Sequence, residues 1–181
     1  MTTWQRIEMG SGERTLCLAM NRWGARRALT RFFSLISRLG DGTFWYTLIA
    51  LLAAFGGLRG LHAALQMTVV GVVAALLYRS LKRWTRRPRP FRTHADIIAY
   101  ILPLDEFSFP SGHTLHAVSF SLIALVYFPW LVPVLLPFTL LVAISRVVLG
   151  LHYPSDVIAA TLIACGISCG SLWLVPAAWL S

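Results

Sequence analysis

Five long apolar runs dominate this sequence and restrict what the chain can fold into. A helix that crosses a bilayer needs about 20 mostly apolar residues, and five stretches approach this length: residues 43–58, 61–81, 114–128, 131–149 and 154–176. None of them shows the alternation of apolar and polar residues that membrane β-strands have. Because backbone groups inside lipid must be hydrogen-bonded internally, the runs predict an all-α, polytopic membrane helical bundle with about five transmembrane helices.

The composition is consistent with a chain surrounded by lipid. Hydrophobic residues make up 57% of the 181 residues and charged residues 13%, whereas soluble domains carry about 25% charged residues. Residues 14–39 differ, because arginines are mixed with apolar residues at helical spacing; this predicts an N-terminal amphipathic helix lying in the membrane interface. We expect Gly40-Asp41-Gly42 to break that helix before the first span, and the polar residues 1–14 indicate no cleavable signal peptide.

The net charge of +9 comes from 16 Lys and Arg against 7 Asp and Glu. These basic residues form two blocks beside apolar runs, as loops next to membrane spans do, and this distribution argues against nucleic acid as a partner. The three cysteines, Cys17, Cys165 and Cys169, show neither a CxxC pair nor zinc-ligand spacing with histidine. We therefore expect no bound metal and no cofactor.

The only long loop, roughly residues 82–112, begins with the only lysine of the chain. This residue, Lys82, is followed by Arg89-Pro90. Lysine binds phosphate as a compact point charge and arginine through a planar fork, so both side chains can serve as anion ligands. A positive cluster that only fixes the topology of the chain is the alternative interpretation.

The sequence Pro110-Ser111-Gly112-His113 opens the third apolar run. Unpaired N–H groups and the helix dipole attract an anion to a helix N-terminus, Gly112 allows close approach, and Ser111 adds a hydroxyl donor. His113 can hold or give up a proton near neutral pH. An ordinary serine N-cap beside an unrelated histidine is the alternative.

A third stretch bridges the fourth and fifth runs and contains Ser145-Arg146, His152 and Asp156. A charge at the end of a span is costly unless it is used. The spacing lets Asp156 accept a hydrogen bond from one imidazole nitrogen of His152, which leaves the other nitrogen free as a base or nucleophile. The alternative is a helix cap with an incidental histidine. In a bundle of short hairpins all three stretches fall on one membrane face, and we expect them to form one anion site.

The three ordered motifs, Lys-x6-Arg-Pro, Pro-Ser-Gly-His and Ser-Arg-x5-His-x3-Asp, resemble the signature of the type 2 phosphatidic acid phosphatase (PAP2) superfamily. The resemblance implies that His152 attacks phosphorus, Asp156 orients it, and His113 protonates the departing lipid alkoxide. It further implies that a phosphohistidine forms and is hydrolysed by water. The implied ligands of the phosphate oxygens are Lys82, Arg89, Ser111, Gly112 and Arg146. No magnesium site is expected, because Asp156 has no partner carboxylate nearby in sequence.

The resemblance therefore implies a metal-independent membrane lipid phosphatase with a lipid phosphate and membrane lipids as partners. Phosphatidic acid, phosphatidylglycerol phosphate and a polyprenyl diphosphate all remain as substrates. A lipid phosphotransferase of the same family is one alternative, and a non-catalytic membrane scaffold or transporter is another. The vanadate-dependent haloperoxidases share this oxyanion site, but they are soluble. Asp41, Asp105 and Glu106 could flank the pocket, but the preferred interpretation is that they are caps or solvated loop charges.

The resemblance also implies a multi-pass protein of the bacterial inner membrane, and two arguments about its orientation disagree. In many bacterial relatives this site faces away from the cytoplasm. In this chain, 15 of the 16 Lys and Arg lie on the face that carries the motifs and only Arg59 lies on the other, which favours a cytoplasmic site. We interpret 1–181 as one domain, with an interfacial segment over 1–40 and a catalytic bundle over 41–181.

Overall fold

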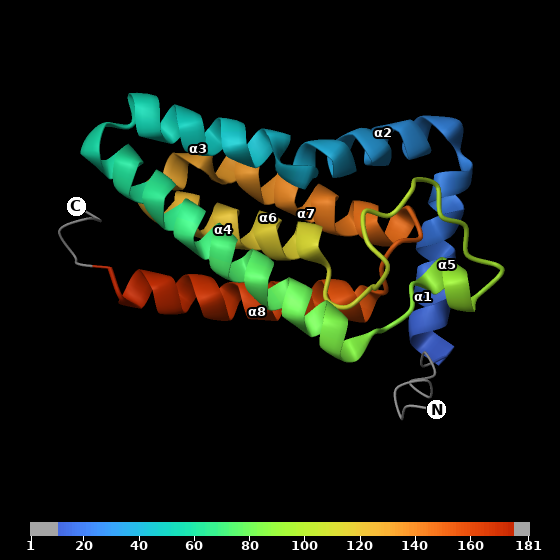
Figure 1. Ribbon diagram of the computed structural model, residues 1–181. Coiled ribbons are helices and arrows are strands. Elements are labelled where there is room, and N and C mark those ends of the chain that lie inside the picture. Colours follow the sequence, from blue (N-terminus) through green and yellow to red (C-terminus); the bar gives the residue numbers. More distant parts are fainter. Residues whose placement is uncertain (1–10, 176–181) are drawn as a thin grey trace.

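The computed structural model describes residues 11–175, and every regular element in this range is helical. Within the described residues the chain forms eight α-helices and three short 3-10 or π turns, and irregular loops join α4 to α5, α5 to α6 and α7 to α8 (Figure 1). The elements are α1 (Ser11–Asn21), η2 (Arg22–Ala25), α2 (Arg27–Arg38), η3 (Leu39–Thr43), α3 (Phe44–Phe55), α4 (Gly57–Thr85), α5 (Pro90–Thr93), α6 (Gly112–Tyr127), η4 (Pro129–Leu131), α7 (Val132–Val148) and α8 (Pro154–Trp173). The prediction of an all-α membrane bundle is confirmed.

Three helical segments are long and apolar enough to cross a membrane by themselves: Gly57–Thr93, Pro129–Val148 and Pro154–Trp173. The helix α6 is apolar but shorter, with 16 residues, and α3 has 12. The five expected spans thus correspond to α3, α4, α6, α7 and α8, although α3 and α6 fall below the length of an independent span. Large apolar side chains such as Val69, Leu76, Ile158 and Leu162 point outward, as lipid-facing positions do.

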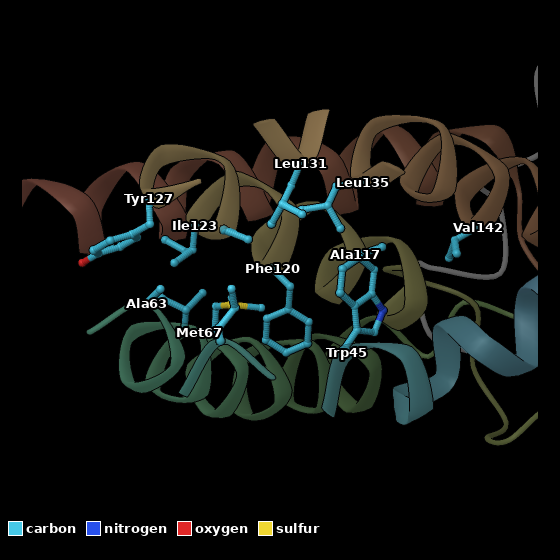
Figure 2. Packing of buried hydrophobic residues seen from close by; sticks show 13 residues of the cluster. Trp45, Ala63, Met67, Ala117, Phe120, Ile123, Tyr127, Leu131, Leu135 and Val142 are labelled. Atoms are coloured by element: carbon cyan, nitrogen blue, oxygen red, sulfur yellow. The ribbon is translucent and has the colours of Figure 1, made fainter. Parts of the chain in front are cut away.

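The main core lies between α3, α4, α6 and α7 and is shown in Figure 2. Trp45 is fully buried at its centre, with ring centroids 5.6 Å from Phe120 and 5.5 Å from Phe138. Small residues allow the helices to approach closely. At Gly60, an added Cβ would lie 2.0 Å from the carbonyl oxygen of Leu52, so glycine is needed where α3 turns into α4.

The N-terminal segment differs from the single interfacial helix that the sequence predicts. It forms two helices, with α1 lying across the end of the bundle and α2 aligned with α3 and packed on α7 (Figure 1). Gly40-Asp41-Gly42 breaks the helix as predicted, because Asp41 and Gly42 have non-helical backbone angles and α2 meets α3 there across a kink. Gly42 has φ +130°, which only glycine adopts without strain, and Gly40 lies against Val142 of α7.

Candidate active site

A cavity of about 890 Å³ lies at the end of the bundle where the motif-bearing loops meet. Six residues of the expected site line it, namely Lys82, Arg89, Gly112, His113, Arg146 and His152. Ser111 and Asp156 are fully buried behind them. Stretches that lie up to 74 residues apart in sequence, such as Lys82 and Asp156, therefore converge on one site.

Hydrogen bonds to backbone carbonyl oxygens connect the three motifs. The guanidinium of Arg89 donates to the carbonyl oxygen of Leu151 at 2.7 Å, and the Ser111 N–H donates to the carbonyl oxygen of Asp156 at 3.3 Å. Within the third motif, the His152 N–H donates to the Arg146 carbonyl oxygen at 3.1 Å. The turn after α7 thereby folds back and directs the His152 side chain toward the cations.

Lys82 and Arg89 are almost completely buried, with 6% and 1% of their surface exposed. Both contact the carboxylate of Asp105: Lys82 Nζ lies 2.7 Å from each oxygen, and Arg89 donates to Oδ1 at 2.7 Å. Burial acts to raise the pKa of Asp105, but the hydrogen bond and charge of Lys82, with Arg89, outweigh it and lower the pKa. Asp105 is a partly solvated loop charge, as the sequence suggested, with 40% of its side chain exposed, but its carboxylate also lies between two buried cations.

Arg146 is buried at the end of α7 and donates to the hydroxyl of Ser37 from α2. Its Nε is buried and has no hydrogen-bond partner among the described residues. A buried donor without a partner carries a free-energy cost, and this one belongs to a side chain that lines the cavity. It is therefore available to an anionic ligand.

His152 is 1% exposed. Its Nδ1 lies 3.4 Å from Asp156 Oδ2, close enough for an ion pair but not aligned as a hydrogen bond. Its Nε2 lies 3.3 Å from Arg89 on the cavity side. Burial, followed by the charge of Arg146, lowers the pKa of His152 well below its usual range. A neutral imidazole with Nε2 toward the cations can act as a nucleophile, and such contacts often tighten only when substrate binds.

His113, in the first turn of α6, has a second carboxylate nearby. Its Nε2 lies 3.4 Å from Oδ1 of Asp41, which lines the same cavity. Burial raises the pKa of Asp41, although the charge of Arg146 opposes this. The sequence interpretation of Asp41 as a cap or solvated charge missed this contact. The sequence signal that was available is an acidic residue between two glycines, Gly40-Asp41-Gly42.

The structure places Ser111 at the N-cap of α6, as the alternative interpretation had it. Its Oγ accepts from the Thr114 N–H at 3.4 Å and lies 3.0 Å from the Thr114 hydroxyl. Its side chain does not line the cavity, whereas Gly112 does. A phosphate contact from Ser111 thus stays a prediction. The cationic side chains that line the cavity are those of Lys82, Arg89 and Arg146.

In residues 11–175, no three His, Cys, Asp or Glu side chains are grouped so that they could hold a metal ion. The positive charge facing the cavity comes from side chains instead. Three buried cations, two histidines and a carboxylate behind one of them define a site that can bind an oxyanion and transfer it to an imidazole.

Comparisons with known proteins agree with this geometry. The sequence model of the PAP2 superfamily matches residues 60–180, and the chain belongs to this superfamily. It is 31% identical over 137 residues to the decaprenylphosphoryl-5-phosphoribose phosphatase of Mycobacterium tuberculosis, covering 76% of this chain and 74% of that protein. The crystal structure of Aquifex aeolicus LpxE is similar with a TM-score of 0.81 and 25% identity, covering 92% of this chain and 98% of that one.

A further relative matches over a shorter region. Phosphatidylglycerophosphatase B of Escherichia coli is 39% identical over 74 residues, which cover 38% of this chain. The chain matches 29% of the length of that relative.

Proposed function

We propose that this chain is an integral membrane lipid phosphatase that hydrolyses a lipid phosphomonoester or diphosphate through a phosphohistidine. The observation that carries the proposal is the cavity in which His152 and His113 face the buried cations Lys82, Arg89 and Arg146. Phosphoryl transfer spreads negative charge over three oxygens, so positioned cations supply most of the catalysis. Side chains provide these charges, and the proposed reaction uses no metal ion.

The proposed reaction has two steps. Nε2 of His152 attacks phosphorus, the bond to the lipid oxygen breaks, and His113 gives its proton to the departing alkoxide. His113, now neutral, then takes a proton from water, which attacks the phosphohistidine and releases inorganic phosphate and free His152. Asp156, 3.4 Å from Nδ1, orients the imidazole and stabilises its positive charge.

Substrates with more than one anionic group fit the cavity best. Seven residues of α4 between 75 and 83 line the cavity, and among them Arg79 and Arg83 lie beside the buried Lys82. No ion pair joins Arg79 or Arg83 to the rest of the described chain. Two such arginines at the mouth support a polyprenyl diphosphate or phosphatidylglycerol phosphate more than phosphatidic acid. The relatives named above are phosphatases of phosphorylated lipids, which is consistent with this class.

Phosphate release from purified protein in detergent tests the proposal. We expect release from at least one of phosphatidic acid, phosphatidylglycerol phosphate and a polyprenyl diphosphate, with activity retained in EDTA and abolished in His152→Ala. Normal turnover by His152→Ala would disprove the mechanism. If the substrate carries a radiolabelled phosphate and the label appears in a second lipid rather than as free phosphate, the chain is a phosphotransferase. If no lipid is turned over, the result contradicts the proposal and favours a non-catalytic scaffold or transporter.

We further propose a place in the bacterial cell membrane, with a single catalytic domain that includes α1 and α2, because both helices pack on α7. The apolar exterior of α4, α7 and α8 and the bacterial relatives support this location.

A further inference from the structure

Arg87 contacts the third motif although it occupies only a variable position of the first motif, Lys-x6-Arg-Pro. Its NH1 donates to Asp156 Oδ1 at 2.7 Å and to the Ser155 hydroxyl at 2.7 Å. Its guanidinium carbon lies 4.1 Å from the centre of the Tyr153 ring. Arg87 is thus fixed by charge, hydrogen bonds and stacking against the residues that start α8.

The other side of Arg87 meets Glu13, which belongs to α1. Oε2 of Glu13 lies 3.4 Å from NH2 of Arg87, and Oε1 accepts the backbone N–H of Ser155 at 3.0 Å. The helix dipole stabilises a carboxylate that lies at the N-terminus of a helix, as Glu13 does at the start of α8. Glu13 therefore caps α8 and braces Arg87 from a helix that lies outside residues 60–180, the region that the family sequence model matches.

Asp156 needs such partners. Its side chain is 0% exposed, and a buried carboxylate is costly unless it is paired and hydrogen-bonded. Oδ1 is held by Arg87, and Oδ2 accepts the Tyr153 N–H at 3.0 Å while facing His152. Arg87 thus fixes both the charge of the carboxylate and the rotation that presents Oδ2 to the imidazole.

We propose that Arg87 and Glu13 are positioning residues that hold Asp156 in place to orient His152, so that α1 forms part of the catalytic apparatus. The kinetic test of this inference rests on the proposed function, whereas the contacts themselves are present in the protein without substrate. The chain of contacts runs from Glu13 through Arg87 and Asp156 to His152.

The docking of α1 does not depend on Glu13. The Asn21 amide donates to the carbonyl oxygens of Ile98 at 2.9 Å and Val148 at 3.1 Å, and its oxygen accepts the Ile98 N–H at 3.0 Å. Cys17 is also buried on this side of α1. Replacing Glu13 therefore removes the brace without releasing the helix. Arg14, which pairs with Asp96 at 2.8 Å in an exposed ion pair, offers a matched control on the same helix.

Steady-state kinetics of Arg87→Ala, Arg87→Lys, Glu13→Gln and Arg14→Ala test the proposal. Loss of a partner behind a reacting group typically costs about 10–100-fold, so we expect such a fall in kcat for Arg87→Ala with KM nearly unchanged. The kcat–pH profile of this variant should also differ from that of the wild type, because the carboxylate behind His152 has lost its cationic partner. Added guanidinium should restore part of the rate. Arg87→Lys and Glu13→Gln should lose less, and Arg14→Ala should behave as wild type.

The tautomer of His152, read from ¹⁵N chemical shifts of histidine-labelled protein, gives a second readout that needs no turnover. We expect the proton on Nδ1 in the wild type and a mixture of tautomers in Arg87→Ala. Wild-type kcat, pH profile and tautomer in Arg87→Ala would overturn the inference. If the wild type itself releases no phosphate from any lipid, the proposed function fails, and the tautomer alone then decides the role of Arg87.

Discussion

Two of the buried cations, Lys82 and Arg89, hold a carboxylate where the proposed reaction needs a phosphoryl group. Asp105 makes 2.7 Å contacts to both side chains, and its pKa is lowered by them, so it remains an anion at neutral pH. A phosphate that binds these cations must displace Asp105 or share them with it. Asp105 is thus a competitor built into the loop between α5 and α6.

The first prediction follows from this competition. Asp105→Asn should bind vanadate and inorganic phosphate more tightly, because an amide competes poorly for two cations. A charged hydrogen bond contributes about 1.5–3 kcal/mol, so a gain of about tenfold or more in affinity is expected, measured as the inhibition constant of vanadate. Asp96→Asn, which removes an exposed carboxylate from the same loop, should leave the constant unchanged. Equal or weaker inhibition of Asp105→Asn would mean that Asp105 supports the cations instead.

Asp41 carries the second prediction, because its carboxylate lies 3.4 Å from His113. A carboxylate stabilises the imidazolium that must donate a proton, so Asp41→Asn should slow substrates with alkyl leaving groups, while nitrophenyl phosphate, which needs little acid, is affected less. Because burial raises the pKa of Asp41, the wild type should lose the same contribution as pH falls, at a pH above the ordinary value of about 4. Equal slowing of both substrates would exclude this role.

The sequence pointed to Lys82, Arg89, His113, Arg146 and His152 because their spacing within short motifs is visible locally. It missed Asp41, Arg87 and Asp105 as site residues because their roles depend on contacts between segments. Arg87, for example, reaches Asp156 across 69 residues of sequence. No local pattern shows which of several loop charges lies against a buried partner.

At the scale of elements, the C-terminal part of α4 supplies basic side chains to the cavity. Lys82 is buried, and Arg79 and Arg83 flank it at the cavity mouth. The third prediction is that Arg79→Ala/Arg83→Ala raises KM for a polyprenyl diphosphate more than for phosphatidic acid. The extra phosphate is the group that loses charged contacts, each worth about 1.5–3 kcal/mol when formed. An equal rise for both substrates would show that the arginines act only through general attraction of anions.

Arg31→Ala is the control for this experiment, because Arg31 is an exposed arginine of α2 that does not line the cavity. It changes the net charge by one without touching the proposed subsite. Its KM values should match the wild type for both substrates.

The helices themselves were predictable, but their joints were not. Apolar runs of helical length predict α4, α7 and α8 directly. The kink at η3 depends on Gly42 adopting φ +130° and on Gly40 fitting against Val142, and neither is visible before the helices pack. The glycines therefore predicted the break between α2 and α3 correctly, but not the direction in which the chain continues or the packing of α2 on α7.

Across the whole molecule, the two ends of the bundle differ in charge. The turn between α3 and α4 lies at one end, and α1, α5 and the motif loops lie at the other (Figure 1). Of the 15 Lys and Arg in the described residues, only Arg59 belongs to the first end. The site needs three of the remaining cations, so catalysis does not account for the asymmetry.

The last prediction is the orientation that this asymmetry sets. Among the described residues, 14 Lys and Arg accompany the site and one lies opposite; without Lys82, Arg89 and Arg146 the ratio is 11 to 1. Short loops rich in Lys and Arg stay in the cytoplasm, so the site should open to the cytoplasm. In a background with Cys17, Cys165 and Cys169 replaced by serine, Ala95→Cys marks the exposed loop beside the site and Trp130→Cys marks the opposite end, where the side chain is 71% exposed. An impermeant maleimide on intact cells should label Trp130→Cys only, and Ala95→Cys should react after permeabilisation. The reverse pattern in phosphatase-active variants would show an outward site and mean that the arginines serve anionic lipid rather than topology.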